Sequence, residues 1–240
     1  MSAPDTGRTA GPGRLRAAGV AVALTVAAVL ASLVGGVAFL LPLFVLAVDV
    51  QSPAAFLALT VVGQLAFLAV GVGYARYRGV VVPIERPTPR EVGLAVGGTV
   101  TALVIVVALS SLIDLLGLTP GSVIGDVAAV EPNLLLSIGV LSIVLVAPIE
   151  EFLFRGVVQG TLVEAYGPVG GVVGSSLLFG SVHLANYTGD PGAVVAGALL
   201  IAGTGAVLGT LYEATGNLTV SILTHGLYNL TLSLIAYATM

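Results

Sequence analysis

The chain of 240 residues contains no cysteine, no tryptophan and no lysine. Without cysteine it can form no disulfide, and it has neither a thiol nucleophile nor a thiolate ligand for zinc or an iron–sulfur cluster. Without tryptophan, any aromatic belt at a membrane interface must be thin. The lack of cysteine leaves the redox compartment undetermined.

Charge is also scarce, since only 8 residues are basic and 12 are acidic. Hydrophobic residues make up 57% of the chain, and the mean hydropathy is +1.11. A soluble domain of this length needs a more polar surface. The sequence therefore predicts an all-α, polytopic membrane helix bundle.

Long apolar runs predict about seven transmembrane helices within a single domain, residues 17–240. Turn and loop signals separate the runs, most clearly the tripeptide Tyr166-Gly167-Pro168. The expected spans are about 17–41, 54–74, 92–113, 134–166, 169–186, 193–213 and 218–238.

Residues 1–16 are predicted to form a disordered cytoplasmic tail. A cleaved signal peptide is the alternative, because Val29-Leu30-Ala31 resembles a small-residue cleavage site. The apolar run continues to Val48, however, which is far longer than a signal-peptide core and favours an uncleaved first span.

The arginines indicate an orientation, because basic loops stay in the cytoplasm. The amino-terminal segment and loop 75–91 carry all of them except Arg155, whereas the acidic loop 114–132 has none. We expect a multi-pass protein of the cell membrane with a cytoplasmic amino terminus, Arg155 on the cytoplasmic side and the carboxyl terminus outside.

Small residues four apart predict close helix contacts, at Gly93 with Gly97 and at Gly205 with Gly209. Gln64 is the lone strongly polar residue of the second span. We expect it to make a hydrogen bond between helices rather than to belong to a site.

The most informative stretch is 148–155, with the sequence PIEEFLFR. Charges within a membrane segment are costly and usually mark function. The only histidines, His183 and His225, lie in later apolar runs. Glu150 and His183 each lie about 25 Å from the turn at Gly167, so they can meet across a hairpin. His225 reaches that depth if the hairpin projects into the cytoplasm, or if the outer turn dips inward; we favour the projecting hairpin.

A carboxylate beside two imidazoles can activate a water molecule for hydrolysis. Glu150 would act as the general base with His183, and His225 and Asn229 would stabilise an oxyanion. Alternatively, Glu150, His183 and His225 could bind zinc or another divalent metal.

Supporting positions follow helical spacing. Glu151 and Arg155 can pair four residues apart, in a structural or an orienting role. Phe179 has the same spacing to His183 and is expected to pack or to form a pocket wall.

Other intramembrane protease motifs are missing from the sequence. It has no His-Glu-x-x-His and no Gly-x-Gly-Asp. Gly174-Ser175-Ser176 lacks the glycine expected after a rhomboid-type serine.

The motifs Glu150-Glu151-xxx-Arg155, Phe179-xxx-His183 and His225-xxx-Asn229 resemble those of the CPBP family, the CAAX-protease and bacteriocin-processing (Abi) group of intramembrane endopeptidases. The resemblance covers about residues 130–235. It implies a multi-helix membrane fold with a cavity open to the cytoplasm. It also implies peptide-bond hydrolysis by Glu150 and His183, with His225 and Asn229 at the oxyanion.

The family is named for metalloproteases, although a metal-free glutamate mechanism is also argued for it. The implied partners are a peptide or lipidated protein substrate and the lipid bilayer, without nucleic acid. Eukaryotic members remove the last three residues of prenylated CAAX proteins.

Two other functions stay open. One is a non-catalytic scaffold or bacteriocin self-immunity protein of the same fold. The other is a proton-coupled transporter, against which stand the lack of an inverted repeat and the clustering of polar residues in one half.

Overall fold

The structure is a computed structural model that describes residues 13–50 and 52–240. The predicted tail lies mostly outside these residues, but the first helix already begins at Arg14. The long helices are α1 (Arg14–Val45), α2 (Pro53–Arg78), α3 (Pro89–Leu115), α7 (Gly160–Ser181), α8 (Pro191–Thr215) and α9 (Leu218–Ala238). The shorter ones are α4 (Val123–Val130), α5 (Asn133–Leu141), α6 (Ala147–Glu151), the π-helical η1 (Ser142–Val146) and η2 (Phe152–Gln159), and the 3₁₀ turn η3 (Leu184–Asn186).

Local sequence signals explain where the helices begin. The hydroxyl of Ser52 caps α2, and Pro53 follows at its first position. Thr88 and Glu91 form a capping box at the start of α3, again followed by a proline, Pro89. These caps satisfy backbone N–H groups that have no partner within their helix.

Six helical stretches of the described chain are long and apolar enough to cross a membrane. The longest, Asn133–Ser181, has 49 residues and is interrupted at Gly167, whose φ is +74°. The chain reverses direction at Gly167. The hydrogen bond from Arg155, before the reversal, to Ser175, after it, shows that the two arms lie side by side. The six candidate spans of the described chain confirm the predicted all-α polytopic bundle, whereas the count of seven stays a prediction that depends on the short arm after Gly167.

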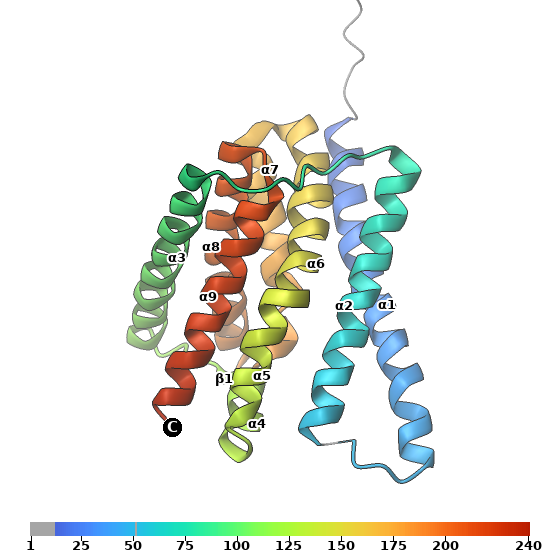
Figure 1. The fold of residues 1–240 in the computed structure, drawn as a ribbon, viewed down its shortest axis with the longest axis vertical. Helices are drawn as coiled ribbons and strands as arrows, with labels where there is room; N and C mark the ends of the chain where they lie inside the picture. The colour runs from blue at the N-terminus through green and yellow to red at the C-terminus, as the bar shows by residue number, and fades with distance from the viewer. Residues whose placement is uncertain (1–12, 51) are drawn as a thin grey trace, which may run out of the picture.

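The helices surround the segment that carries the glutamates (Figure 1). The α1–α2 hairpin packs on one side against η2, α6 and α7, while α9 packs between α3 and α5. The start of α1 and the carboxyl-terminal end of the chain lie at opposite ends of the bundle (Figure 1).

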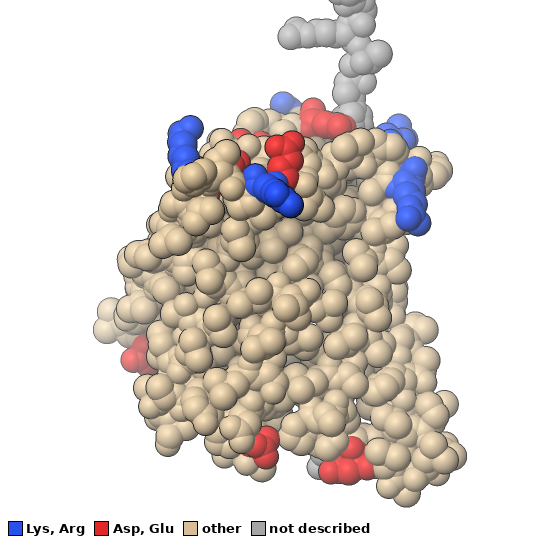
Figure 2. Space-filling model, in the orientation of Figure 1, with Lys and Arg blue, Asp and Glu red and all other residues tan. Residues whose placement is uncertain are grey.

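Basic side chains gather at the end of the bundle where α1 begins, and the visible face of the other end carries acidic ones alone (Figure 2). The arginines of this end come from the start of α1, the end of α2 and the link to α3. The protein is therefore an integral membrane protein with asymmetric ends. Which end faces the cytoplasm stays a prediction from the positive-inside rule.

The predicted fifth span is too long at its carboxyl end. The helix ends at Ser181, and residues 184–186 form the turn η3. The following strand β2 (Tyr187–Thr188) pairs antiparallel with β1 (Gly121–Ser122) from the acidic loop. The side chain of His183 bonds the backbone carbonyl of Phe179 in the last helical turn. Such side-chain bonds to the backbone compete with the continuation of a helix, and the helix ends here.

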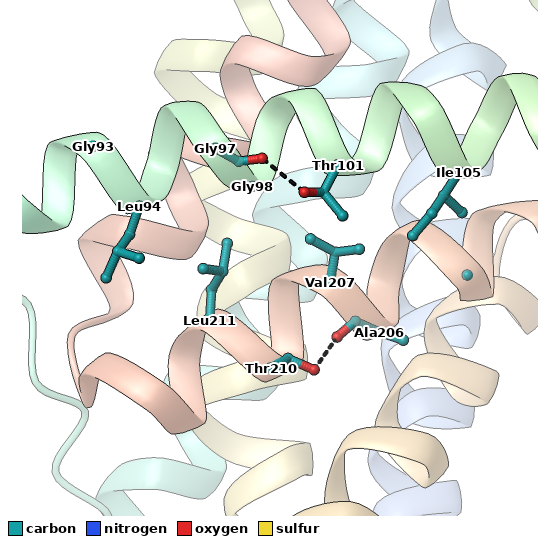
Figure 3. Close-up of a pocket in the computed structure, with 11 residues that line it drawn as sticks. Gly93, Leu94, Gly97, Gly98, Thr101, Ile105, Ala206, Val207, Thr210 and Leu211 are labelled. Carbon is teal, nitrogen blue, oxygen red and sulfur yellow. Dashed lines mark hydrogen bonds between the residues drawn. The ribbon is translucent and has the colours of Figure 1, made fainter.

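The two glycine pairs differ in what they contact. Gly205 and Gly209 make the predicted close contacts, with Arg155 and with Gln159 respectively. The prediction for Gly93 and Gly97 is wrong, because no atom of another element lies within 4 Å of a Cβ placed there. Both instead line an apolar groove of about 520 Å³ between α3 and α8 (Figure 3).

Candidate active site

The segment that carries the glutamates departs twice from regular α-helix. The π-helical η1 precedes α6 and the π-helical η2 follows it. Pro148 lies within this segment and lacks the N–H that a continuous α-helix would use. Such π-helical turns are frequent at functional sites, since they re-aim the side chains beside them.

Glu150 is the central side chain of the site. One carboxylate oxygen, Oε1, accepts a hydrogen bond of 2.8 Å from Nε2 of Gln64 on α2. The other, Oε2, is buried and has no hydrogen-bond partner within residues 13–50 and 52–240. It lies 4.0 Å from Nε2 of His183 and 3.9 Å from Nε2 of His225. The structure thus brings the predicted carboxylate and both histidines together around one free oxygen.

Glu151 points to a different set of partners. Its Oε2 accepts a hydrogen bond of 3.1 Å from Nε of Arg155, and its Oε1 lies 3.0 Å from Nδ1 of His225. The side chains of Glu151 and Arg155 are completely buried. A carboxylate can only accept, so the Nδ1 atom of His225 carries the hydrogen. Glu151 therefore fixes both the orientation and the tautomer of this imidazole.

His183 is oriented by its own helix. Its Nδ1 lies 2.8 Å from the backbone carbonyl of Phe179, four residues earlier. A carbonyl can only accept, so Nδ1 carries the hydrogen and Nε2 of the neutral ring is an acceptor. The His183 side chain is 18% exposed, compared with 7% for Glu150. Both imidazoles thus turn Nε2 toward the same carboxylate oxygen.

Phe179 forms an apolar wall behind both imidazoles. Its ring meets that of His183 edge to face at a centroid distance of 4.8 Å, and that of His225 at 5.8 Å. The guanidinium of Arg155 lies 5.0 Å from the same ring centroid. The expected pocket-wall role agrees with this geometry.

Asn229 lies one turn beyond His225 on α9. Its amide nitrogen donates a hydrogen bond of 2.7 Å to the hydroxyl of Ser142 on η1. That bond uses one of its two N–H groups, and the second is the one left for a substrate. Asn229 therefore bonds Ser142, whereas the two predicted histidines face Oε2 of Glu150.

A buried polar chain continues from Arg155 to the surface. Arg155 donates to the hydroxyl of Ser175 at 3.3 Å, and Ser175 donates to Oε1 of Gln159 at 3.0 Å. Gln159 donates in turn to the carboxylate of Glu213 at 2.7 Å. These bonds join η2, α7 and α8 around the predicted supporting pair.

The contacts of Gln159 bear on how His225 reaches the depth of Glu150, for which either a projecting hairpin or an inward-dipping outer turn was expected. Gln159 lies level with Gly209 and Glu213, close to the end of α8 at Thr215. The hairpin continues for eight more residues, about 12 Å, to Gly167. This favours the projecting hairpin over a turn that dips inward.

In the described part of the chain, no group of three or more His, Cys, Asp or Glu side chains is placed so that it could hold a metal ion. Nε2 of His183 and Nε2 of His225 nevertheless both face Oε2 of Glu150, at 4.0 and 3.9 Å. These three side chains are the ones that would hold zinc or another divalent metal, and metal binding stays a prediction.

These features define a class: a helical membrane protein with a buried glutamate and two imidazoles on separate spans. Comparison with protein families identifies the class more closely. Residues 132–231 match the family described as type II CAAX prenyl endopeptidase Rce1-like. The match contains all three motifs and confirms the resemblance to the CPBP family. This is a protease family, which supports a peptidase.

No curated protein and no solved structure matches the chain. The family match begins at residue 132, so α1, α2 and α3 lie outside it. Its description names CAAX prenyl endopeptidases, and neither a metal ion nor the bacteriocin-processing branch.

The most important residue of the site that sequence reasoning missed is Gln64. It was expected to bond another helix, which it does, but its partner is Glu150 itself. The available signal was its isolation as the one strongly polar side chain of an apolar span. Ser142 and Gln159 were also missed, since single hydroxyls and amides in helices usually bond their own backbone.

Proposed function

We propose that the protein is an intramembrane endopeptidase that hydrolyses peptide bonds of membrane-associated substrates, prenylated CAAX-type proteins included. The observation that carries this proposal is the unpartnered Oε2 of Glu150, which lies about equally far from Nε2 of both histidines. A buried carboxylate oxygen without a partner requires a water molecule or a substrate group.

Glu150 and His183 activate the water. Their facing atoms are 4.0 Å apart, so one water oxygen can lie about 2.8 Å from each. Both atoms are acceptors, and the water donates one hydrogen to each of them. The lone pairs of its oxygen then face away from these groups, toward a scissile carbonyl. Glu150 takes the proton as general base and returns it to the leaving amine.

His225 stabilises the oxyanion. Its Nδ1–H is held by Glu151, so Nε2 can donate only when the ring is protonated. The buried carboxylate of Glu151 places a negative charge beside this ring. Asn229 adds its second amide N–H from the same face of α9, one turn away.

The family match supports the substrate class. Type II CAAX prenyl endopeptidases act on prenylated proteins, whose lipid keeps the scissile bond at the membrane. The partners proposed here are such a peptide or lipidated protein and the bilayer, with no nucleic acid.

The decisive experiment uses purified protein and a quenched prenylated peptide. The wild type, Glu150→Ala, His183→Ala and the matched surface variant Glu164→Ala are compared, each with and without a chelator. We expect cleavage by the wild type and by Glu164→Ala, and loss in both site variants. Full cleavage by Glu150→Ala or His183→Ala would overturn the proposal.

The chelator arm tests the alternative cofactor chemistry. Cleavage that persists with chelator supports the water mechanism without a metal. Cleavage that is lost and then restored by zinc would assign Glu150, His183 and His225 as ligands after a rearrangement of their side chains.

A further inference from the structure

We propose that Gln64 is the residue that positions the reacting carboxylate and keeps its two oxygens chemically distinct. This inference rests on the proposed hydrolysis at Glu150. It concerns a helix outside residues 132–231, so the family match does not assign it. The proposal starts from one contact, the 2.8 Å hydrogen bond from Nε2 of Gln64 to Oε1 of Glu150.

That bond gives the two oxygens of the Glu150 carboxylate different roles. Oε1 is occupied by Gln64, and among the described residues Oε2 has no hydrogen-bond partner. Rotation of the carboxylate about its last bond would exchange the two oxygens. A hydrogen bond to a charged acceptor opposes this rotation, and it directs Oε2 toward the two imidazoles. The water is thereby held in one place.

Packing of one face of α2 fixes the position of Gln64. This face also carries Phe67 and Gly71, at helical spacing from Gln64, and it is turned toward the segment that carries the glutamates. The ring of Phe67 lies 6.3 Å from that of Phe154, and a Cβ at Gly71 would lie 3.2 Å from the ring of Phe152. The side chain of Gln64 therefore extends from a helix that is packed directly against the glutamates.

A second atom of Gln64 also points to the site. Its Oε1 is buried and, like Oε2 of Glu150, has no hydrogen-bond partner among the described residues. An amide fixed at one end by Glu150 can offer this oxygen to an N–H group of the peptide substrate. We therefore assign Gln64 as a positioning residue that touches both the base and the substrate backbone.

The test compares Gln64→Met and Gln64→Glu with the matched control Thr60→Val. Met keeps the length of the side chain and removes the hydrogen bond, whereas Glu keeps the shape and replaces the donor by an acceptor. Thr60 lies one turn earlier on α2, and its hydroxyl bonds the carbonyl of Phe56 in its own helix. Initial rates of peptide cleavage, KM and the melting temperature are measured for each variant beside Glu150→Gln.

We expect kcat of Gln64→Met to fall about 10- to 100-fold, the range that corresponds to a hydrogen bond to a charged group. KM should change by about twofold at most, because the substrate gains most of its binding elsewhere. Gln64→Glu should lose more, since two carboxylates would then face each other. Thr60→Val should match the wild type.

Other results of this experiment would overturn either this inference or the proposed function. Wild-type kcat in both Gln64 variants, with Glu150→Gln inactive, would overturn this inference and leave the proposed function intact. A fully active Glu150→Gln, or a wild type that cleaves no peptide, would overturn the proposed function itself. If both Gln64 variants unfold while Thr60→Val does not, Gln64 is a structural residue and the inference is overturned.

Discussion

Glu151 accepts hydrogen bonds from both His225 and Arg155, one at each carboxylate oxygen. The two neighbouring glutamates therefore differ in role, because Oε2 of Glu150 has no hydrogen-bond partner among the described residues whereas both oxygens of Glu151 have one. A carboxylate held at both oxygens serves to orient and to supply charge. It is poorly placed to take a proton from water.

The first prediction concerns Glu151→Gln. The amide oxygen still accepts from Nδ1 of His225, but the negative charge beside that ring is lost. We expect kcat to fall about 100-fold or more, with little change in KM. Steady-state kinetics check this, with Glu164→Gln on the exposed hairpin as the control. An unchanged kcat would remove His225 from the oxyanion role.

The second prediction concerns Arg155→Met. Arg155 is fully buried, and its removal leaves the buried charge of Glu151 without its cationic partner. Breaking such a pair costs about 3–5 kcal/mol of stability. Thermal unfolding in detergent should show a large drop in melting temperature, whereas the exposed Arg90→Met should show almost none. Equal melting temperatures for the two variants would contradict the prediction.

The third prediction contrasts two glycines. A Cβ at Gly205 would lie 3.1 Å from Phe179 and 3.2 Å from Nη2 of Arg155, whereas one at Gly97 meets nothing within 4 Å. Gly205→Ala should therefore lower both stability and activity. Gly97→Ala should raise stability by up to about 1 kcal/mol, because alanine favours helix. The melting temperatures of the two variants test this. A higher melting temperature for Gly205→Ala than for Gly97→Ala would contradict the close contacts of Gly205 with Phe179 and Arg155.

The fourth prediction concerns Gln159→Leu. Gln159 accepts from Ser175 and donates to Glu213, so its loss leaves buried polar partners unsatisfied. We expect destabilisation by about 1–3 kcal/mol. Activity should fall less than in Glu151→Gln, since Gln159 acts through Ser175 and Arg155. The control is Thr210→Val, because the hydroxyl of Thr210 donates to the carbonyl of Ala206 in its own helix. A larger loss of activity than in Glu151→Gln would show that Gln159 acts directly.

Helix geometry was sufficient to predict some of the residues that meet. Equal distances of Glu150 and His183 from the turn at Gly167 place them opposite each other, whatever the packing of the other helices. The four-residue spacing of Glu151 and Arg155 likewise predicts their pairing. These relations depend on helix geometry alone, which explains why they hold.

Other relations depend on how separate helices pack, and spacing does not encode them. Gln64 reaches Glu150 because α2 lies against α6, and Asn229 meets Ser142 because α9 lies against η1. Gly93 and Gly97 of α3 have the same spacing as Gly205 and Gly209 of α8, yet of these two pairs only the one on α8 lies close to side chains of another helix. Spacing shows that a close contact is allowed, whereas the neighbouring helices decide whether it forms.

The reversal at Gly167 has a consequence for how the chain enters the membrane during synthesis. The arm before it carries Glu150, Glu151 and Arg155, and a charged residue at the centre of a membrane helix opposes insertion by about 2.5–3.5 kcal/mol. The short arm after it contains no charged residue up to Ser181. Entry of both arms as one hairpin would let the apolar second arm offset part of the cost of the first.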